Sequence, residues 1–154
     1  MQKKIALACL TLAVTGSALA QQLMRPEEMI QTRQAGYRFM AWNMGKIKAN
    51  LEAGYNKDQV VAAANLVAAT ANSGMGALYS PASGKNVGAV KTRVKPEFFQ
   101  QPDEVKKLAV AYNKEANELA RVAASGDAAA VKVQFGKTGE ACKACHDKFR
   151  EEDM

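Results

Sequence analysis

Two cysteines and a histidine near the end of the chain are the residues best suited to chemistry. They stand in the run Cys142-Lys-Ala-Cys145-His146, and His146 is the single histidine of the sequence. On a helix, residues three positions apart share one face about one turn apart. Two such thiols can add to the two vinyl groups on one edge of a porphyrin, and the next imidazole can then reach the iron. C-x-x-C-H is the spacing of covalent haem attachment. We expect one haem c on Cys142 and Cys145, with His146 as an iron ligand.

Two other chemistries also use a C-x-x-C pair. A structural zinc site needs four ligands, but outside the motif the chain offers only Cys9 and no further histidine. A thioredoxin-like dithiol should follow a strand inside a βαβ unit, and no alternating strand pattern is visible. Haem is therefore favoured, and a redox dithiol or a metal site is the alternative.

The first twenty residues have the pattern of a cleaved signal peptide. A basic start is followed by an apolar stretch over residues 5–14 and an A-x-A cleavage site at residues 18–20. The apolar stretch is too short to span a bilayer, and Cys9 lies inside it. We expect residues 1–20 to be removed and residues 21–154 to form one haem-binding domain in a bacterial periplasm.

The charge of the chain is modest and excludes some partners. The formal net charge is +6, which falls to +4 when Lys3 and Lys4 are removed with the signal peptide. Two haem propionates would lower it to about +2. This dispersed charge gives no argument for nucleic acid. Because no second apolar run reaches membrane length, we expect a mature protein with neither nucleic-acid nor membrane partners.

The rest of the chain predicts four amphipathic helices. Proline suits the first helical position and glycine the end, and Asn56 with Gln59 has the spacing of a capping box. These signals indicate helices over about 26–53, 57–72, 102–125 and 128–151. Residues 73–101 should be a long irregular connection. The sequence thus predicts an all-α fold, an antiparallel four-helix bundle with one long loop between helices two and three.

Two apolar seams should face each other across the haem. A charge at a core position needs a partner, and Arg33 lies on the first of these seams. If the first helix packs on the far side of the porphyrin, a pocket should lie between Tyr37 and the C-x-x-C-H run. The seam of the first helix consists of Ile30, Arg33, Tyr37, Met40, Met44, Ile47 and Leu51, and that of the last helix of Val131, Phe135, Thr138, Cys142, Cys145 and Phe149.

A haem motif near the end of the last helix of a four-helix bundle resembles cytochrome c′, the class II c-type cytochromes. The resemblance covers residues 21–154 and is most specific over Cys142–Arg150 and then over Pro26–Met44. It implies a five-coordinate iron that binds NO and CO on a crowded face and cycles between Fe(III) and Fe(II).

The same resemblance assigns roles to individual residues. It implies that Arg33 meets a haem propionate with Gln34 beside it, and that Tyr37 lies over the open face of the iron. Arg150, four residues after His146 and on its side of the helix, resembles the basic residue near the proximal face. No catalytic residue is expected.

Other functions remain open at this point. The runner-up is a six-coordinate electron-transfer cytochrome with Met40 or Met44 as the sixth ligand, since methionine ligation raises the haem potential. A peroxidase is disfavoured because no distal histidine–arginine pair exists, so we do not expect an enzyme. The first two helices of this family often pair, so we expect a homodimer, with an unidentified redox partner.

Overall fold

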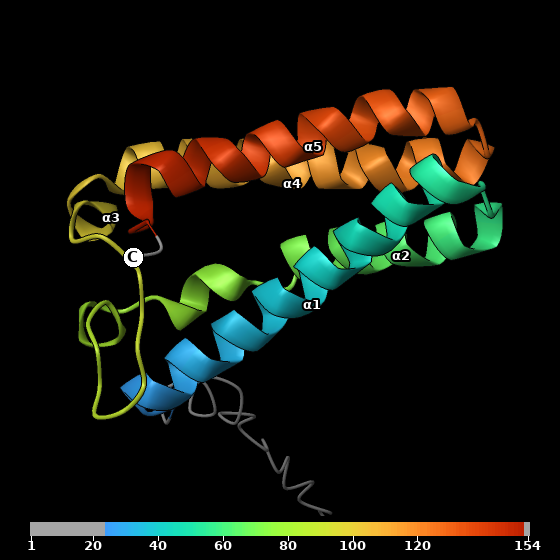
Figure 1. Cartoon of the computed structure of the whole chain (residues 1–154). Coiled ribbons are helices and arrows are strands. Elements are labelled where there is room, and N and C mark those ends of the chain that lie inside the picture. The colour runs from blue at the N-terminus through green and yellow to red at the C-terminus, as the bar shows by residue number, and fades with distance from the viewer. Residues whose placement is uncertain (1–23, 153–154) are drawn as a thin grey trace, which may run out of the picture.

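The computed structural model describes residues 24–152, so the predicted signal peptide lies outside the described part. Four long helices form an antiparallel bundle (Figure 1), as predicted. Their bounds are α1 Pro26–Ala53, α2 Lys57–Ala71, α4 Pro102–Ser125 and α5 Ala128–Phe149. The last helix ends two residues before the predicted Glu151, because the chain after it turns to pair with residues 93–95.

The connection between α2 and α4 is less irregular than predicted. It contains two short 3-10 helices, η2 Met75–Leu78 and η3 Pro81–Ser83, and the four-residue helix α3 Glu97–Gln100. Pro81 stands at the first position of η3, and Ser80 caps it through its side chain. These local signals are too short to give a periodic pattern, so hydropathy alone could not find them.

The start of α2 corrects the predicted capping box. The Asn56 side chain does accept from the backbone N–H of Gln59, at 3.1 Å. However, the backbone N–H of Asn56 donates to Asn50 Oδ1 at 3.0 Å, and Gln59 Oε1 accepts from Asn50 Nδ2 at 3.2 Å. A buried asparagine at the end of α1 therefore takes the place predicted for the glutamine and ties the two helices at their turn.

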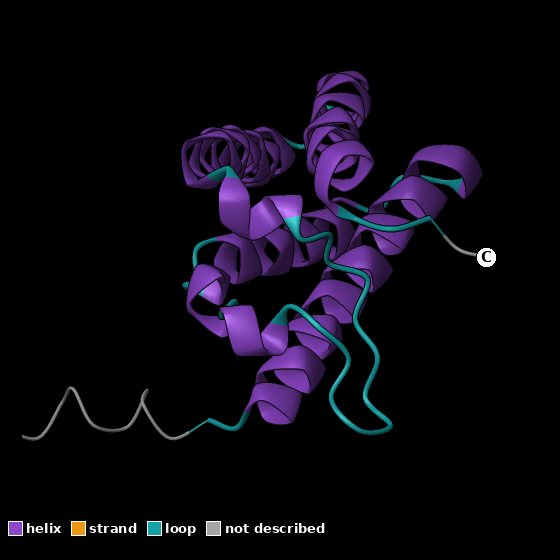
Figure 2. Ribbon diagram, turned by 90° about the vertical axis from the view of Figure 1, so that its left-hand side faces the viewer, coloured by secondary structure: helices purple, strands orange, loops and turns teal. Residues whose placement is uncertain are grey.

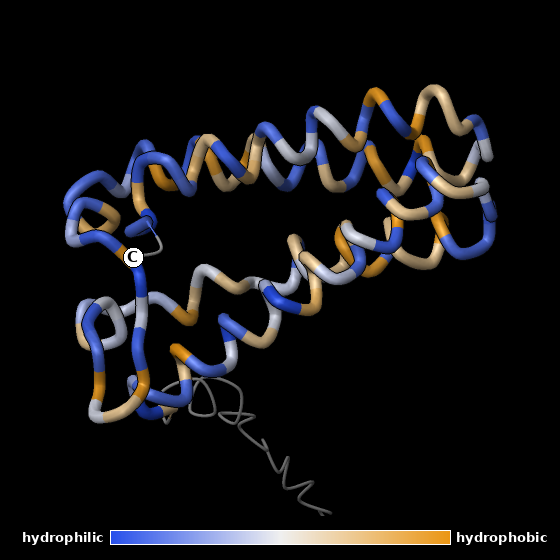
Figure 3. Tube along the Cα trace, in the orientation of Figure 1, coloured by the Kyte–Doolittle hydropathy of each residue, from blue (hydrophilic) through white to orange (hydrophobic). Residues whose placement is uncertain are grey.

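The apolar core lies at the end of the bundle where α1 turns into α2 and α4 into α5. Apolar segments of all four helices meet there (Figure 3). Small residues on α2 and α4 let the helices approach closely, and the larger side chains fill the space between them. The buried members are Ile47, Val60, Ala63, Ala64, Leu119, Ala123 and Val131.

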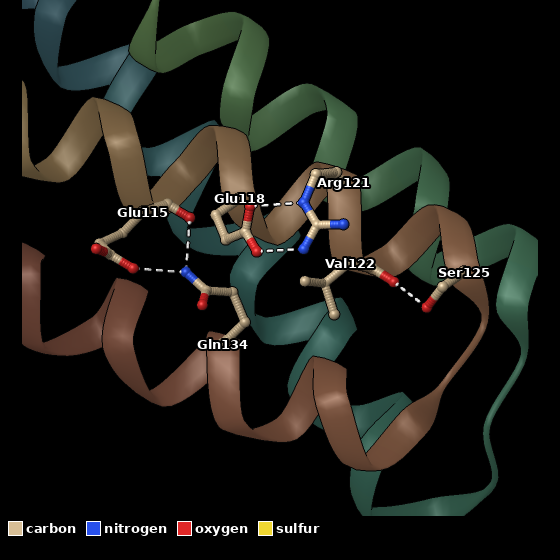
Figure 4. Close-up of polar contacts among 6 residues, drawn as sticks. All are labelled: Glu115, Glu118, Arg121, Val122, Ser125 and Gln134. Atoms are coloured by element: carbon tan, nitrogen blue, oxygen red, sulfur yellow. Dashed lines mark hydrogen bonds and ion pairs between the residues drawn. The ribbon is translucent and has the colours of Figure 1, made fainter.

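Polar contacts join α4 to α5 midway along the bundle (Figure 4). Gln134, 5% exposed, donates from Nε2 to the Glu115 carbonyl at 3.1 Å and to Glu115 Oε2 at 2.6 Å. The fully buried Thr138 hydroxyl also bonds to the Glu115 carbonyl, at 3.2 Å. Because both buried side chains find partners, they fix the register of α5 against α4 at little cost.

At the opposite end α1 and α5 diverge, and the connection closes the space between them (Figures 1 and 2). Backbone N–H groups of Lys95 and Glu151 donate to the carbonyls of Phe149 and Arg93, at 2.9 and 2.8 Å. The Phe98 ring meets Phe149 edge to face, with centroids 5.8 Å apart. The C-x-x-C-H end of α5 is thus fastened to the connection. Within residues 24–152, no helix combines the length and hydrophobicity needed to cross a membrane.

Candidate functional site

The two cysteines of the motif are half-buried free thiols on one face of α5. Burial raises the pKa of both thiols, and for Cys142 the neighbouring Cys145 adds to the effect. Thiols with raised pKa values are mostly protonated near neutral pH.

Tyr37 of α1 lies near enough to the cysteine pair to interact with it electrostatically, and its predicted position over the iron stays a prediction. Although 41% of its surface is exposed, enough protein surrounds the ring that burial raises the pKa of its hydroxyl, and Cys145 and Cys142 add to the effect. Its hydroxyl lies 3.4 Å from that of Tyr79, which comes from the connection. The opening helix and the last helix therefore meet at one site.

Two further tyrosines belong to this site and were not predicted as site residues. Tyr79 follows η2, and burial raises the pKa of its hydroxyl strongly, with Tyr37 adding to the effect. Burial also raises the pKa of the Tyr112 hydroxyl on α4, and the neighbouring Cys142 raises it further. Tyr112 lies on the inward face of its helix, a position that helical periodicity can identify from the sequence. Tyr79 lies in a loop, where no periodic pattern marks it as a site residue.

The hydroxyl of Tyr112 donates to the sulfur of Met40. Met40 is 6% exposed and packs with Val67 of α2 and Ala116 of α4. Its thioether is therefore turned toward the bundle interior and already has a donor. Met44, half-buried, packs against the same core.

Arg33, which needed a partner for its buried charge, finds one in the connection. It is 2% exposed, and its two terminal nitrogens make four hydrogen bonds. Nη1 donates to the Leu78 carbonyl at 2.9 Å and to Ser83 Oγ at 3.0 Å, and Nη2 donates to the Ser83 carbonyl at 2.6 Å and to Thr92 Oγ1 at 2.8 Å. Burial lowers the pKa of Arg33. The predicted propionate contact remains a prediction, with Nε–H as the donor that these four bonds leave over.

Gln34 binds the same segment as its neighbour. Its Nε2 donates to the Lys91 carbonyl at 2.7 Å. Arg33 and Gln34 together hold residues 78–83 and 91–92 of the connection against the first turns of α1. Both residues thus support the site in a way the sequence did not predict.

His146 is exposed and lies among charged side chains of both signs. Its Nδ1 lies 3.4 Å from Nη1 of Arg150. The role predicted for Arg150, near the proximal face of the haem, stays a prediction. Burial lowers the pKa of the imidazole first and the charge of Arg93 lowers it further, while Asp147 raises it. A neutral imidazole is the form that binds a metal. Because Nδ1 faces Arg150, Nε2 is the nitrogen open to a ligand.

A cavity of about 200 Å³ adjoins this histidine. We expected a pocket lined by the whole motif and by Tyr37, but this cavity touches only His146 of those residues. Its lining is formed by Arg93, Lys95, His146, Asp147, Arg150, Glu151 and Glu152.

The alternatives to haem find little support. In the part of the chain that the structure describes, no three His, Cys, Asp or Glu side chains gather as a metal site. Two thiols on one helical face, an adjacent imidazole and aromatic side chains opposite them form a donor set that fits a covalently held haem. It does not fit a four-ligand zinc site.

Comparison with known proteins decides between these possibilities. A sequence model of the cytochrome c′ family matches residues 28–150. The chain belongs to the cytochrome c′ family. Members of this family carry covalently bound haem c, and Cys142 and Cys145 supply the matching C-x-x-C-H motif. The resemblance seen in the sequence is confirmed, and so is the cofactor.

Close relatives of this cytochrome c′ chain extend over nearly its whole length. The cytochrome c′ of Allochromatium vinosum is 62% identical over 141 residues, 92% of this chain and 91% of the relative. The crystal structure of cytochrome c′ from Thermochromatium tepidum is 66% identical, with a TM-score of 0.82 over 84% of this chain and 98% of that one. A further cytochrome c′ structure, described as having an unusual ligand-controlled dimer dissociation, is 64% identical over the same shares, with a TM-score of 0.83.

Proposed function

We propose that this chain is an exported cytochrome c′ whose iron has His146 as its one protein ligand, binds NO and CO, and undergoes Fe(III)/Fe(II) redox. The bound haem supplies an iron centre that changes oxidation state and takes up a diatomic ligand. The protein holds it through Cys142 and Cys145 and surrounds the site with tyrosines. The observation that carries the proposal is the position of the methionines, because they are the alternative source of a sixth ligand.

Met40 is a poor candidate for that ligand. Its sulfur accepts the Tyr112 hydroxyl, and its side chain packs between α2 and α4. Turning the thioether toward the C-x-x-C face would leave the Tyr112 hydroxyl without this partner and empty a packed position. Met44 lies one turn deeper in the same core. Tyr37 on α1 and Tyr112 on α4 are the side chains that interact electrostatically with the cysteine pair, and a neutral phenol is a weak iron ligand.

Optical and resonance Raman spectra of the ferric and ferrous protein test the coordination number. The expected result is a high-spin, five-coordinate ferrous spectrum that changes on addition of NO or CO. Met40→Leu and Met44→Leu should leave the spectrum unchanged. A low-spin ferrous spectrum that becomes high-spin in either variant would instead establish the six-coordinate electron carrier.

The gas ligands are supported by a relative and by the site. A structure of the Alcaligenes xylosoxidans cytochrome c′, at 25% identity and a TM-score of 0.73, has been determined as a variant with carbon monoxide bound. Binding of O₂ gains from a strong distal hydrogen-bond donor, whereas CO and NO depend on one less. The Tyr37 hydroxyl, the polar group that we propose lies over the iron, already lies beside the Tyr79 hydroxyl. No histidine–arginine pair for O–O cleavage is available, so we propose no enzymatic activity.

We propose that the protein forms a homodimer through the outer face of α1. Phe39 and Trp42 are 46% and 58% exposed, and their rings stack with centroids 5.7 Å apart. Leu66 of α2 adds a third exposed apolar side chain. Exposed aromatic residues gathered in this way are typical of protein interfaces, and one relative is described as a dimer. Sedimentation should give a dimer that Trp42→Gln weakens. Val110→Gln is a matched control, since Val110 is exposed on α4.

Export and cleavage are the remaining parts of the proposal. The purified protein should begin at Gln21, as measured by intact mass, and should carry the mass of one haem. It should appear in the periplasmic fraction. A chain that retains residues 1–20 while carrying haem would contradict the predicted cleavage site.

A further inference from the structure

Tyr79 is the only described side chain that hydrogen-bonds to Tyr37. The contact joins the two hydroxyl oxygens at 3.4 Å, with Tyr79 as the donor. This is long for an O–H···O bond, for which 2.5–3.0 Å is usual. The contact is therefore weak enough to open without unfolding anything around it.

The two tyrosines differ sharply in how they are held. Tyr79 is clamped, because the Arg33 guanidinium lies 4.6 Å from its ring centroid and the Phe98 ring stacks on it at 4.5 Å. Its backbone N–H also donates to the Gly76 carbonyl at 3.1 Å. Tyr37 has no ring partner among the described aromatic contacts, and 41% of its surface is exposed. Of the pair, Tyr37 is the one free to turn.

Arg33 makes the clamp rigid. Its four hydrogen bonds to the connection fix the guanidinium, and the guanidinium fixes the Tyr79 ring by a cation–π contact. The positioning therefore runs from the connection through Arg33 and Tyr79 to Tyr37. Nothing in the sequence pattern connects residue 79 to the site.

We propose that Tyr79 is a positioning residue that restrains Tyr37 against the C-x-x-C face, so that a diatomic ligand which displaces Tyr37 must break the contact between the two hydroxyls. This inference rests on the proposed five-coordinate iron with Tyr37 over its open face. It adds a restraint from the connection, outside the helices that carry the motif and the facing wall.

Binding of CO to the ferrous protein measures the restraint. Tyr79→Phe keeps the ring with its Arg33 and Phe98 contacts and removes only the hydroxyl. We expect CO association and affinity to rise about two- to fivefold, the lower part of the range for one lost hydrogen bond because the contact is long. Phe98→Leu removes the ring that stacks on Tyr79 but keeps the Tyr79 hydroxyl. It should raise the CO association rate and affinity by less than Tyr79→Phe does. Tyr55→Phe, which removes a phenol far from the motif, should change neither.

A double-mutant cycle separates positioning from a general structural effect. In a Tyr37→Phe background, Tyr79→Phe should have no further effect on CO binding, because the residue it restrains has lost its hydroxyl. Ultraviolet resonance Raman spectra of the ligand-free protein give a second measure, in which either single variant should remove the same hydrogen-bonded tyrosine signal. The midpoint of urea unfolding should be close to that of the wild type in both variants.

The outcomes distinguish the inference from the proposed function. If Tyr37→Phe accelerates CO binding but Tyr79→Phe does not, the restraint is wrong while the five-coordinate site stands. An equal effect of Tyr79→Phe in both backgrounds would also overturn the restraint. A six-coordinate iron in the wild type would overturn both proposals together.

Discussion

Replacing Arg33 by methionine should destabilise the protein through the connection rather than through α1. The change keeps an unbranched side chain of similar length in the helix, so helix propensity is nearly unaffected. What is lost are the four hydrogen bonds to Leu78, Ser83 and Thr92 and the stacking on Tyr79. The effect therefore measures how firmly the guanidinium holds residues 78–92.

The magnitude follows from what each acceptor keeps. The Leu78 carbonyl still accepts from Ser83 Oγ at 3.2 Å, and Thr92 is only half-buried, so water can reach it. The Ser83 carbonyl, in a residue with no exposed surface, loses the donor described for it. An unsatisfied buried carbonyl costs about 1–3 kcal/mol, and the three other charged bonds are lost as well. Against this, removing a buried charge recovers several kcal/mol of desolvation. We expect a net loss of about 2–4 kcal/mol.

Urea unfolding followed by circular dichroism tests this estimate. With a slope of about 2 kcal/mol per molar, the loss corresponds to a midpoint lower by about 1–2 M. Arg38→Met is the matched control, since Arg38 is exposed on the same helix. Arg33→Lys keeps the charge but not the planar fork and should fall between the two. If Arg33→Met unfolds at the same midpoint as Arg38→Met, the connection is not held by this guanidinium.

Three smaller predictions probe a cap, a close approach and a pH dependence. Asp127→Ala should cost about 0.5–2 kcal/mol in urea unfolding, because its carboxylate accepts from the backbone N–H groups of Ala129 and Ala130 in the first turn of α5, at 2.9 and 3.1 Å, while Asp127→Asn should cost little. Gly84→Ala should lower the free energy of unfolding by about 1–3 kcal/mol, because its Cβ would lie 2.2 Å from the Phe99 ring. A Cβ added at Gly45 would meet no atom within 4 Å, so Gly45→Ala should stabilise α1 in a melting experiment. Burial raises the pKa of Tyr112 above its ordinary value of 10, so its contribution to stability is complete below pH 10 and is lost as the pH rises further. The free energy of unfolding should therefore fall less above pH 10 in Tyr112→Phe than in the wild type.

The long helices could be predicted because their signals are local. Pro26 and Pro102 stand at first helical positions, Gly54 and Gly126 follow helix ends, and the apolar spacing between these signals is regular. Each signal acts within a few residues of itself, so tertiary structure does not alter it. The capping box at Asn56 failed for the opposite reason, because a residue from the preceding helix reached the same N–H group.

The site was predictable only where it shares the helical periodicity. The cysteines and Tyr37 lie on seams, so the sequence placed them on facing helices. Tyr79 lies after a four-residue 3-10 helix, and its contact with Tyr37 spans 42 positions. Such a contact depends on how the connection folds back, which no local pattern encodes. The hydrogen bonds of Arg33 to Leu78, Ser83 and Thr92 could not be predicted for the same reason.

The connection is therefore part of the site rather than a spacer between helix pairs. Arg33 and Gln34 bind it from one turn of α1, and Tyr37 on the next turn contacts Tyr79 of the connection. Since a turn of helix is rigid on this scale, moving the connection moves the clamp on Tyr79 relative to Tyr37. A substitution in residues 78–92, distant in sequence from the C-x-x-C-H motif, should change ligand access without touching the residues that hold the haem.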